Sequence, residues 1–534
     1  MKHWDEILLH FREQQHVIAQ GGGAKAIARQ HEKLRWTARE RIERLIDADT
    51  TFHELGLWAA WNMYAEWGGA PSASVICGIA TVSGREVMVI ANDATVKAGA
   101  FFPMTAKKVL RAQNIALTNR LPICYLVDSS GVFLPLQDEI FPDEDDFGRI
   151  FRNNAVISAA GVPQIAAIMG NCVAGGGYLP VLCDKLVMTN GSGLYLAGPA
   201  LVKSSIGQEV SHEELGGAQM HAEISGTIDF LELDDESCLK RVRALIATFP
   251  ENPVSPLFRR EMPLSPARAT DEIYQLVTPD PQAAYDLREV LECLVDKDTF
   301  QEYKAGYGKT LICGYARWNG FQIGIVGNQH KQEKSPQAGI QFGGVIYPES
   351  ADKAARFILD CNQTWTPIVF LQDVYGFMVG KQAEQGGIIR AGAKLVNAIA
   401  NSRVPKITVI TGGSYGAGNY ALCGKAFDPR FSFAWPTAKY AVMGARQAAA
   451  TLLDINIAAM KRTGRDVDAE EMEELRRKTV GDYEEQTDIR YAAARGWVDA
   501  VIEPDQTREM VTRALEWSTR YADDVPLKSG VWQV

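Results

Sequence analysis

Two glycine-rich turns are the residues of this sequence best suited to chemistry. Residues 174–178 are AGGGY and residues 415–420 are YGAGNY, and each turn follows an apolar run and opens a helix of small residues. Glycines there leave backbone N–H groups open at the positive end of a helix, where they can stabilise an oxygen that gains negative charge. The alternative is that the glycines only allow the helix to pack closely on a sheet.

Other catalytic patterns are missing from the sequence. It has no GxxxxGK[ST] phosphate loop, no GxSxG elbow and no HExxH zinc motif. Four of the eight histidines (His3, His10, His16 and His31) lie near the amino terminus, so a histidine-based triad has little support. Two oxyanion sites without a base of their own indicate enolate chemistry in which a cofactor supplies the base.

The elements that must position these turns occur twice in the chain. Residues 78–93 (GIATVSGREVMVIAND) match residues 314–329 (GYARWNGFQIGIVGNQ), and both have the alternating pattern of a two-stranded hairpin. Each copy continues with a helix (106–122 or 351–367), a buried strand that ends in aspartate, and a further strand (163–170 or 405–412) that leads into the glycine turn. The order is the same in both copies, which indicates a duplicated domain.

The alternation of strands and helices predicts an α/β fold, with helices flanking largely parallel sheets. Residues 250–281 hold seven of the 23 prolines, a density that prevents continuous helix or sheet. We therefore predict an N-terminal domain at 1–249, a connector at 250–281 and a C-terminal domain at 282–534.

The bulk composition limits the class of protein. The chain has 534 residues, of which 46% are apolar and 22% charged, and its net charge of −10 argues against nucleic acid as the main partner. Its nine cysteines show no metal-ligand spacing, which favours a reducing compartment and no metal. Acidic residues in the first helix exclude a signal peptide, and no run of 18 apolar residues occurs. We expect no membrane association, and a cytoplasmic protein or a mitochondrial matrix protein whose targeting peptide has been removed.

Several long segments resemble one known family, the carboxyltransferase β subunits of biotin-dependent acyl-CoA carboxylases. The similarity is greatest to the methylcrotonyl-CoA and geranyl-CoA branch and runs from about residue 30 to the carboxyl terminus. The segments that carry it are RIERLIDADTTFHEL, GREVMVIANDATVKAGAFFPMTAKKVLRAQNIA, VDSSGVFLPLQDEIFPDEDDFGRIF, AGGGYLPVLCD, LAGPALVKSSIGQEVSHEELGG, GGSYGAGNYALCGKAFDPRFSFAWPTA and VMGARQAA.

This resemblance implies two tandem crotonase-like domains, with acyl-CoA on the first domain of one subunit and biotin on the second domain of a partner subunit. Dimers of this kind would assemble into a hexamer. Backbone N–H groups would hold the thioester enolate oxygen in the first domain and the ureido oxygen of biotin in the second, and the cofactor would supply the base. The implied residues are Gly175 and Gly176 for the first oxygen, Ala417 and Gly418 for the second, Gly177, Tyr195, Ser130 and Gly131 around the acyl group, and Gly416, Gly376 and Phe377 around biotin.

Some positions depart from the family pattern and bear on the substrate. Ser130 stands where a second glycine is common, and the turn at 191–193 is one residue shorter than in methylcrotonyl enzymes. Tyr195 replaces a common phenylalanine and would favour a compact acyl chain, unless its ring only packs in the core. Methylcrotonyl-CoA is the expected substrate, and geranyl-, propionyl- and acetyl-CoA are the alternatives.

The chain lacks parts that a complete carboxylase needs. Residues 459–462 (AMKR) come near the AMKM motif of biotin attachment, but a highly charged helical stretch follows and excludes that role. Biotin would therefore be carried by a partner α subunit with biotin carboxylase activity. A glutaconyl-CoA or methylmalonyl-CoA decarboxylase subunit, an inactive scaffolding paralogue and a hydratase-type crotonase remain alternatives. Basic residues could meet CoA phosphates or form a solvated helix face: Lys33, Arg35, Arg39, Arg41 and Arg44.

Overall fold

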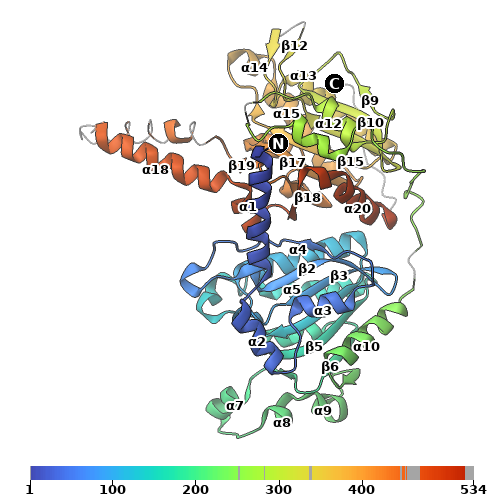
Figure 1. Ribbon diagram of the computed structural model, residues 1–534, viewed down its shortest axis with the longest axis vertical. Helices are drawn as coiled ribbons and strands as arrows, with labels where there is room; N and C mark the ends of the chain where they lie inside the picture. The colour runs from blue at the N-terminus through green and yellow to red at the C-terminus, as the bar shows by residue number, and fades with distance from the viewer. Residues whose placement is uncertain are drawn as a thin grey trace. The chain divides into compact units, whose positions relative to one another are not determined.

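The computed structural model describes residues 2–250, 253–281, 283–335, 339–444, 448–451, 453, 457 and 469–522. The chain forms two compact units (Figure 1). The N-terminal unit comprises Arg12–Pro253 and Ala493–Gly496, and the C-terminal unit comprises Met1–Phe11, Val254–Ala492 and Trp497–Val534. Among the described residues, no helix has the length and apolar character that crossing a bilayer requires.

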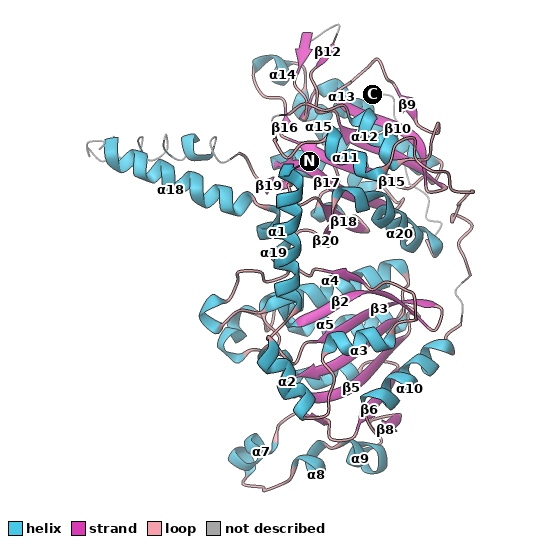
Figure 2. Cartoon of the chain, viewed as in Figure 1, coloured by secondary structure: helices cyan, strands magenta, loops and turns pink. Residues whose placement is uncertain are grey.

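An eight-stranded sheet forms the centre of the N-terminal unit (Figure 2), with strands β1 (His53–Leu55), β2 (Val75–Val82), β3 (Arg85–Asn92), β4 (Ile123–Ser129), β5 (Gln164–Val173), β6 (Lys185–Thr189), β7 (Gly193–Tyr195) and β8 (Phe230–Glu232). The order is β1-β2-β3-β4-β5-β6-β8, and β7 pairs with β5. β1 to β3 pair antiparallel, whereas β3 to β6 and β8 pair parallel. The parallel strands are largely apolar because helices cover both faces of the sheet.

Helices α3 (Ala38–Leu45) and α10 (Asp235–Ala247) cover one face of this sheet, where Ile42 and Val242 join a core with Cys124 and Leu126. Helix α4 (Pro103–Asn119) packs on the opposite face against α5 (Phe147–Ala159). The other helices are α2 (Ala24–Glu32), α6 (Tyr178–Val181), α7 (Pro199–Ile206), α8 (His212–Gly216) and α9 (Ala218–Met220), and α1 (Lys2–Ala19) contributes residues to both units.

The C-terminal unit repeats the arrangement. Its main sheet has the order β20-β18-β17-β15-β11-β10-β9, and β19 pairs with β17. Its strands are β9 (Gln301–Tyr303), β10 (Leu311–Trp318), β11 (Phe321–Asn328), β15 (Ile368–Val374), β17 (Lys406–Tyr415), β18 (Phe431–Ala434), β19 (Lys439–Ala441) and β20 (Ala500–Val501). Two small ribbons add β12 (Glu333–Ser335) with β13 (Gly339–Gln341), and β14 (Val345–Ile346) with β16 (Gly376–Phe377).

Equivalent helices flank this second sheet. Helices α13 (Pro348–Gln363) and α15 (Ile388–Asn401) bury one face in a large apolar core, and α12 (Leu287–Leu294) contacts α20 (Thr507–Arg520). The other α-helices among the described residues of this unit are α11 (Ile273–Leu276), α14 (Lys381–Gln385), α16 (Gly416–Ala421), α18 (Ala469–Thr487) and α19 (Ile489–Ala494). Both sheets share strand order and direction, so the predicted α/β fold is confirmed.

A matched aspartate joins the hairpin turn to the last helix in each unit. In the N-terminal unit, Asp47 accepts hydrogen bonds from the backbone N–H groups of Ser83 (2.8 Å) and Gly84 (2.7 Å). Arg243 of α10 pairs with the same carboxylate at 2.6 Å and also donates to the carbonyl of Leu45. In the C-terminal unit, the equivalent residues make the same contacts: Asp296, Asn319, Gly320, Arg508 and Leu294.

Replacing Asp296 by alanine should destabilise the protein more than replacing Asp47. The side chains of Asp296 and Arg508 are 0% and 12% exposed, whereas those of Asp47 and Arg243 are 21% and 33% exposed. Removing one partner of a buried ion pair costs about 3–5 kcal/mol, and an exposed pair contributes about 1 kcal/mol or less. Thermal unfolding of the two variants measures the difference, and a larger loss for Asp47→Ala would contradict it.

The proline-rich segment is associated with the C-terminal unit. Residues 254–281 group with that unit, and the backbone N–H of Glu261 donates to the carbonyl of Gly320 in the β10–β11 turn. The amino terminus joins the same unit, since the Trp4 indole N–H donates to the carbonyl of Val277 at 2.9 Å. The boundaries 1–249, 250–281 and 282–534 stay a prediction.

Candidate active site

The first glycine turn lies at the carboxyl end of β5. A tight helical turn, Ala174–Gly177, leads directly into α6, and Gly176 is buried. A Cβ atom placed on Gly176 would lie 3.7 Å from Cα of Gly131, which follows β4, so two glycine backbones face each other there. The first N–H groups of a helical turn have no partner within it, so those of Gly175 and Gly176 can serve a bound oxygen.

The second glycine turn occupies the same place in the C-terminal sheet. Helix α16 begins at Gly416, directly after β17. Gly418 is buried and Ala417 is exposed. A Cβ atom on Gly418 would lie 3.2 Å from Cα of Gly376 and 2.6 Å from a methyl group of Val374, so this pair of backbones is packed more tightly than the first.

Side-chain hydrogen bonds hold the second turn in place. The Asn419 amide donates to the Ser414 hydroxyl at 2.8 Å and to the Tyr440 hydroxyl at 2.9 Å. The Gln372 amide donates to the carbonyl of Leu422 at 2.7 Å. These bonds connect β15, β17, α16 and β19, so the turn is fixed by the strands around it.

A buried aspartate lies beside each turn, at an irregularity in the strand pairing. The register shifts at Asp128 between β4 and β5, and at Asp373 between β15 and β17. Asp128 accepts from the backbone N–H of Asn171 at 3.2 Å, and Asp373 accepts from that of Gly413 at 2.7 Å. Each carboxylate therefore fixes the strand that leads into the turn.

Glycine is required opposite each of these aspartates. A Cβ atom on Gly170 would lie 2.0 Å from Cγ of Asp128, and one on Gly412 would lie 2.4 Å from Cγ of Asp373. No side chain fits at such a distance, so the glycine that ends each predicted strand makes room for the carboxylate.

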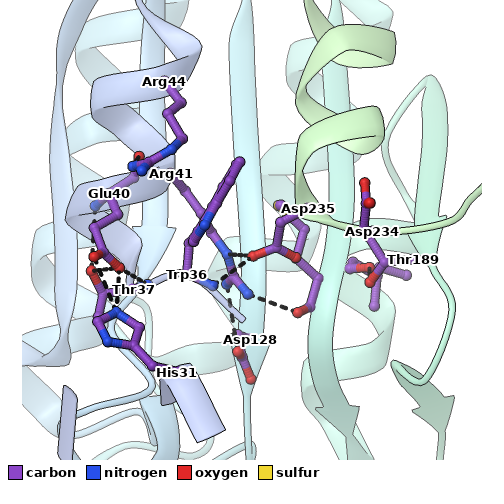
Figure 3. A network of polar contacts seen from close by, with 12 residues as sticks. His31, Trp36, Thr37, Glu40, Arg41, Arg44, Asp128, Thr189, Asp234 and Asp235 are labelled. Atoms are coloured by element: carbon purple, nitrogen blue, oxygen red, sulfur yellow. Dashed lines mark hydrogen bonds and ion pairs between the residues drawn. The ribbon is translucent and has the colours of Figure 1, made fainter. Parts of the chain in front are cut away.

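Arginine neutralises the aspartate of the N-terminal unit (Figure 3). Arg41 Nε donates to Asp235 at 2.9 Å, its Nη2 donates to the carbonyl of Met169 at 2.8 Å, and its Nη1 lies 3.5 Å from Asp128. Burial raises the pKa of Asp128, and the charge of Arg41 opposes that shift. The guanidinium therefore ties α3 and α10 to the strand ends that carry the first turn.

In the C-terminal unit, a histidine and a tyrosine contact the equivalent aspartate. The Tyr285 hydroxyl donates to Asp373 at 2.9 Å, and His330 Nε2 lies 3.4 Å from the same carboxylate. Burial raises the pKa of Asp373, and His330 opposes that shift. The two turns thus share a backbone arrangement but differ in the side chains behind it.

The predicted acyl-pocket residue Tyr195 lies on β7, with its backbone paired opposite Val173. Its ring packs edge-on against His212 with centroids 5.5 Å apart, and its hydroxyl lies 3.3 Å from His212 Nδ1. Leu194 points to the other face of the strand, where its methyl group lies 3.4 Å from the Cβ position of Gly177. Leu194 therefore contacts the turn directly, and the role of Tyr195 at the acyl group stays a prediction.

The other predicted residues lie beside the two turns. Ser130 is exposed, and the next residue, Gly131, has φ +88°. Gly376 has φ +124° at the matching place after β15, and positive φ values of this kind favour glycine. The Phe377 ring packs against α15, 3.0 Å from the Cβ position of Gly392, so Phe377 faces the core and only its backbone lies next to Gly376.

Basic residues of the amino-terminal segment are largely engaged within the unit. Arg39 makes a bidentate pair with Glu54 at 2.8 and 3.1 Å. Arg44 lies 4.2 Å from the centroid of an indole ring, and Arg35 donates to a backbone carbonyl at 2.6 Å. Lys33 is exposed.

Part of the predicted pattern falls outside the described residues: 445–447 of the VMGARQAA segment and the near match to a biotin-attachment motif at 459–462. Within the described part of the chain, no group of three histidine, cysteine or acidic side chains could hold a metal ion. All nine cysteines are described, and each is free and buried.

The sequence prediction gave no role to the paired aspartates. Asp128 and Asp373 end the matching runs ICYLVD and IVFLQD, so their repetition was a visible signal. Their partners Arg41, Tyr285 and His330 come from distant segments and have no common pattern.

Comparisons with known proteins identify the family. A model of the carboxyl transferase domain matches residues 29–529. This chain belongs to the carboxyl transferase family. The carboxyltransferase is 46% identical over 501 residues to the biotin-dependent 3-methylcrotonyl-coenzyme A carboxylase β1 subunit of Mycobacterium tuberculosis, with 93% of this chain and 91% of that protein covered. It is 42% identical over 511 residues to the mitochondrial methylcrotonoyl-CoA carboxylase β chain of Arabidopsis thaliana, with 95% and 84% covered.

A solved structure agrees with this assignment. The crystal structure of the geranyl-CoA carboxylase β subunit of P. aeruginosa superposes on this carboxyltransferase with a TM-score of 0.85 at 33% identity, covering 99% of this chain and 95% of that one. The family resemblance predicted from the sequence motifs is confirmed, and the activity of the chain is carboxyl transfer.

Proposed function

We propose that this carboxyltransferase is the β subunit of a biotin-dependent acyl-CoA carboxylase that acts on 3-methylcrotonyl-CoA. The duplicated turn carries the proposal, because each unit has a glycine turn facing a second glycine at the same place in its sheet. Carboxyl transfer between biotin and a thioester develops negative charge on an oxygen of each reactant. Two pre-organised sets of N–H donors match that requirement.

On the acyl side, the N–H groups of Gly175 and Gly176 would hold the thioester oxygen. Removal of the γ proton of 3-methylcrotonyl-CoA turns this oxygen into the oxyanion of a dienolate, and donors fixed before the reaction stabilise it without reorganising. Gly177, Ser130, Gly131 and Tyr195 would surround the acyl group.

On the biotin side, the N–H groups of Ala417 and Gly418 would hold the ureido oxygen. The residues fit a close approach of this kind, because Ala417 is exposed and the first N–H groups of a helix have no partner within it. Gly416, Gly376 and the backbone of Phe377 would flank it. Biotin supplies the carboxyl group and then the base, so the chain needs no basic side chain at this place.

A partner must carry the biotin. The relatives named above are β subunits or chains, and this sequence has no ATP-binding phosphate loop. We therefore propose an α subunit with biotin carboxylase and biotin carrier functions. Because the two turns lie in different units, we also propose a homo-oligomer of dimers, a hexamer, in which one copy offers acyl-CoA and its partner copy offers biotin. The cytoplasm or the mitochondrial matrix is the proposed location.

Purification with the native α subunit gives the test of this function. ATP- and bicarbonate-dependent carboxylation of methylcrotonyl-, geranyl-, propionyl- and acetyl-CoA should give the highest kcat/KM for methylcrotonyl-CoA. A preference for another thioester would contradict the substrate. Binding of acyl-CoA without carboxylation would indicate a scaffolding paralogue, and decarboxylation as the only reaction would indicate a decarboxylase subunit.

Replacing Tyr195 by glycine should shift the preference from methylcrotonyl-CoA toward geranyl-CoA. Removing a ring that closes a pocket changes discrimination by about 1–3 kcal/mol per methylene of fit. The ratio of kcat/KM for geranyl-CoA to kcat/KM for methylcrotonyl-CoA measures this shift. Leu194→Ala is the matched comparison, because Leu194 contacts the glycine turn itself. An unchanged ratio in an active Tyr195→Gly enzyme would show that this ring does not line the pocket.

A further inference from the structure

Two tyrosines stand directly before the glycines of the C-terminal turn. Tyr375 precedes Gly376, and Tyr415 precedes Gly416. Their rings lie nearly parallel, with centroids 5.9 Å apart and an angle of 16° between the planes. Tyr375 is 42% exposed, so part of its ring can meet a ligand.

The tyrosine pair is absent from the equivalent place in the N-terminal unit. The strand registers align Tyr375 with Ser130 and Tyr415 with Val173. Both units have the same sheet and the same turn, so the fold does not require aromatic rings here. A difference between two copies of one scaffold indicates a difference in what each copy binds.

Glycines make room for both rings. A Cβ atom on Gly344 would lie 2.6 Å from the ring of Tyr375, and one on Gly413 would lie 3.0 Å from the ring of Tyr415. Any side chain at Gly344 would displace the tyrosine, so the backbone is shaped around these rings.

Two polar groups fix the hydroxyl of Tyr375. It donates to the carbonyl of Pro281 at 2.6 Å and lies 3.2 Å from His330 Nε2. The His330 ring stacks on Tyr285 with centroids 4.9 Å apart and planes within 7°, and Tyr285 in turn donates to Asp373. The contacts link the exposed ring of Tyr375 to the aspartate that holds the strand before the turn.

His330 faces a small cavity of about 40 Å³ that Tyr285, Asp373, Tyr375 and Tyr415 also line. Its Nδ1 atom is buried and has no hydrogen-bond partner among the described residues. The cavity is large enough for an ordered water, which would satisfy this nitrogen. The histidine is therefore held by stacking, and its Nε2 lies 3.2 Å from the Tyr375 hydroxyl and 3.4 Å from the Asp373 carboxylate.

We propose that Tyr375 and Tyr415 form an aromatic platform for the fused rings of biotin, and that His330 is a positioning residue that holds Tyr375. This inference rests on the proposed function of the C-terminal turn. The bicyclic body of biotin is largely apolar and its urea edge is polar. Aromatic rings on the residues directly before Gly376 and Gly416 match the first part, and the N–H donors of the turn match the second. A serine and a valine on the acyl side leave that turn open to a ligand of another shape.

Free biotin and the carboxylated thioester product are the probes that test the platform on the full chain. Tyr375→Leu and Tyr415→Leu should each raise the KM for biotin by about three- to tenfold and leave the KM for the thioester unchanged. Tyr307→Leu is the matched control, because Tyr307 is 41% exposed in the same unit and its ring packs under Lys304. An unchanged KM for biotin in both platform variants would overturn the inference.

The positioning role of His330 needs a readout that general damage would not produce. His330→Phe keeps the stacking on Tyr285 and removes the nitrogen, so it should raise the KM for biotin by a larger factor than it lowers kcat. Its effect should not exceed that of Tyr375→Phe, which also removes the hydrogen bond to Pro281. The double variant should be no worse than Tyr375→Phe alone, because that change already removes the contact with His330. Additive effects would overturn this role. If the wild-type chain transfers no carboxyl group to biotin, the proposed function itself fails.

Discussion

Gly176→Val should lower the rate of acyl-CoA carboxylation by about 100- to 1000-fold, the usual effect of losing an oxyanion donor. The new side chain would enter the space between Gly176 and Gly131, where a Cβ atom meets nothing closer than 3.7 Å. The fold therefore tolerates the first added carbon, and the loss should come from excluding the thioester oxygen. Steady-state kinetics with the native α subunit measure it.

A matched control separates this effect from a general effect of valine. Gly148 lies exposed in α5 of the same unit, and its Cβ position meets only one atom, at 3.8 Å. Gly148→Val should keep near wild-type activity. If Gly176→Val also did, the glycine turn would serve packing alone and the oxyanion assignment would be wrong.

Gly418→Val should block transfer from biotin by a comparable factor, about 100-fold or more, and leave acyl-CoA binding nearly intact. The C-terminal turn is packed tightly, so the valine would also press on Val374, 2.6 Å from the Cβ position. Gly418→Ala combined with Val374→Ala relieves that contact and should still impair transfer. Calorimetry with acyl-CoA and the transfer assay measure the two properties separately.

The control for the C-terminal turn is Gly481→Val. Gly481 lies in α18, and a Cβ atom there would meet nothing within 4 Å. The Gly418→Val variant is compared for both properties: if it lost acyl-CoA binding as strongly as carboxyl transfer from biotin, the C-terminal turn would not act on biotin alone.

The sequence predicted the framework of the site because the framework depends on local patterns. Glycines at matching places, an aspartate three residues before Gly131 and again before Gly376, and apolar runs of strand length are all visible in the chain itself. Duplication doubled each signal, so the two sheets and the two turns could be predicted together.

The side chains that contact the buried aspartates beside the turns could not be predicted from local patterns. Arg41 and Asp128 are 87 residues apart in sequence, and Tyr285 and Asp373 are 88 apart, so no periodicity connects them. Their meeting depends on how α3 and the segment before α12 pack on the strand ends, which is a property of the tertiary fold.

The orientation of Tyr195 shows a second limit. Alternation along a strand places Leu194 and Tyr195 on opposite faces, but which face meets the turn depends on the pairing of β7 with β5. That pairing joins Val173 and Tyr195, which belong to separate motifs of the sequence. The neighbour of the chosen residue therefore proved to contact Gly177.

Mixing the two turn variants tests most directly whether one active site joins the N-terminal turn of one copy to the C-terminal turn of another. Co-expression of Gly176→Val and Gly418→Val subunits should restore about a quarter of wild-type activity, since half of the dimers are mixed and each has one intact site. Each variant expressed alone should stay inactive. No recovery in mixed oligomers shown by mass spectrometry to contain both subunits would contradict a site shared between two copies.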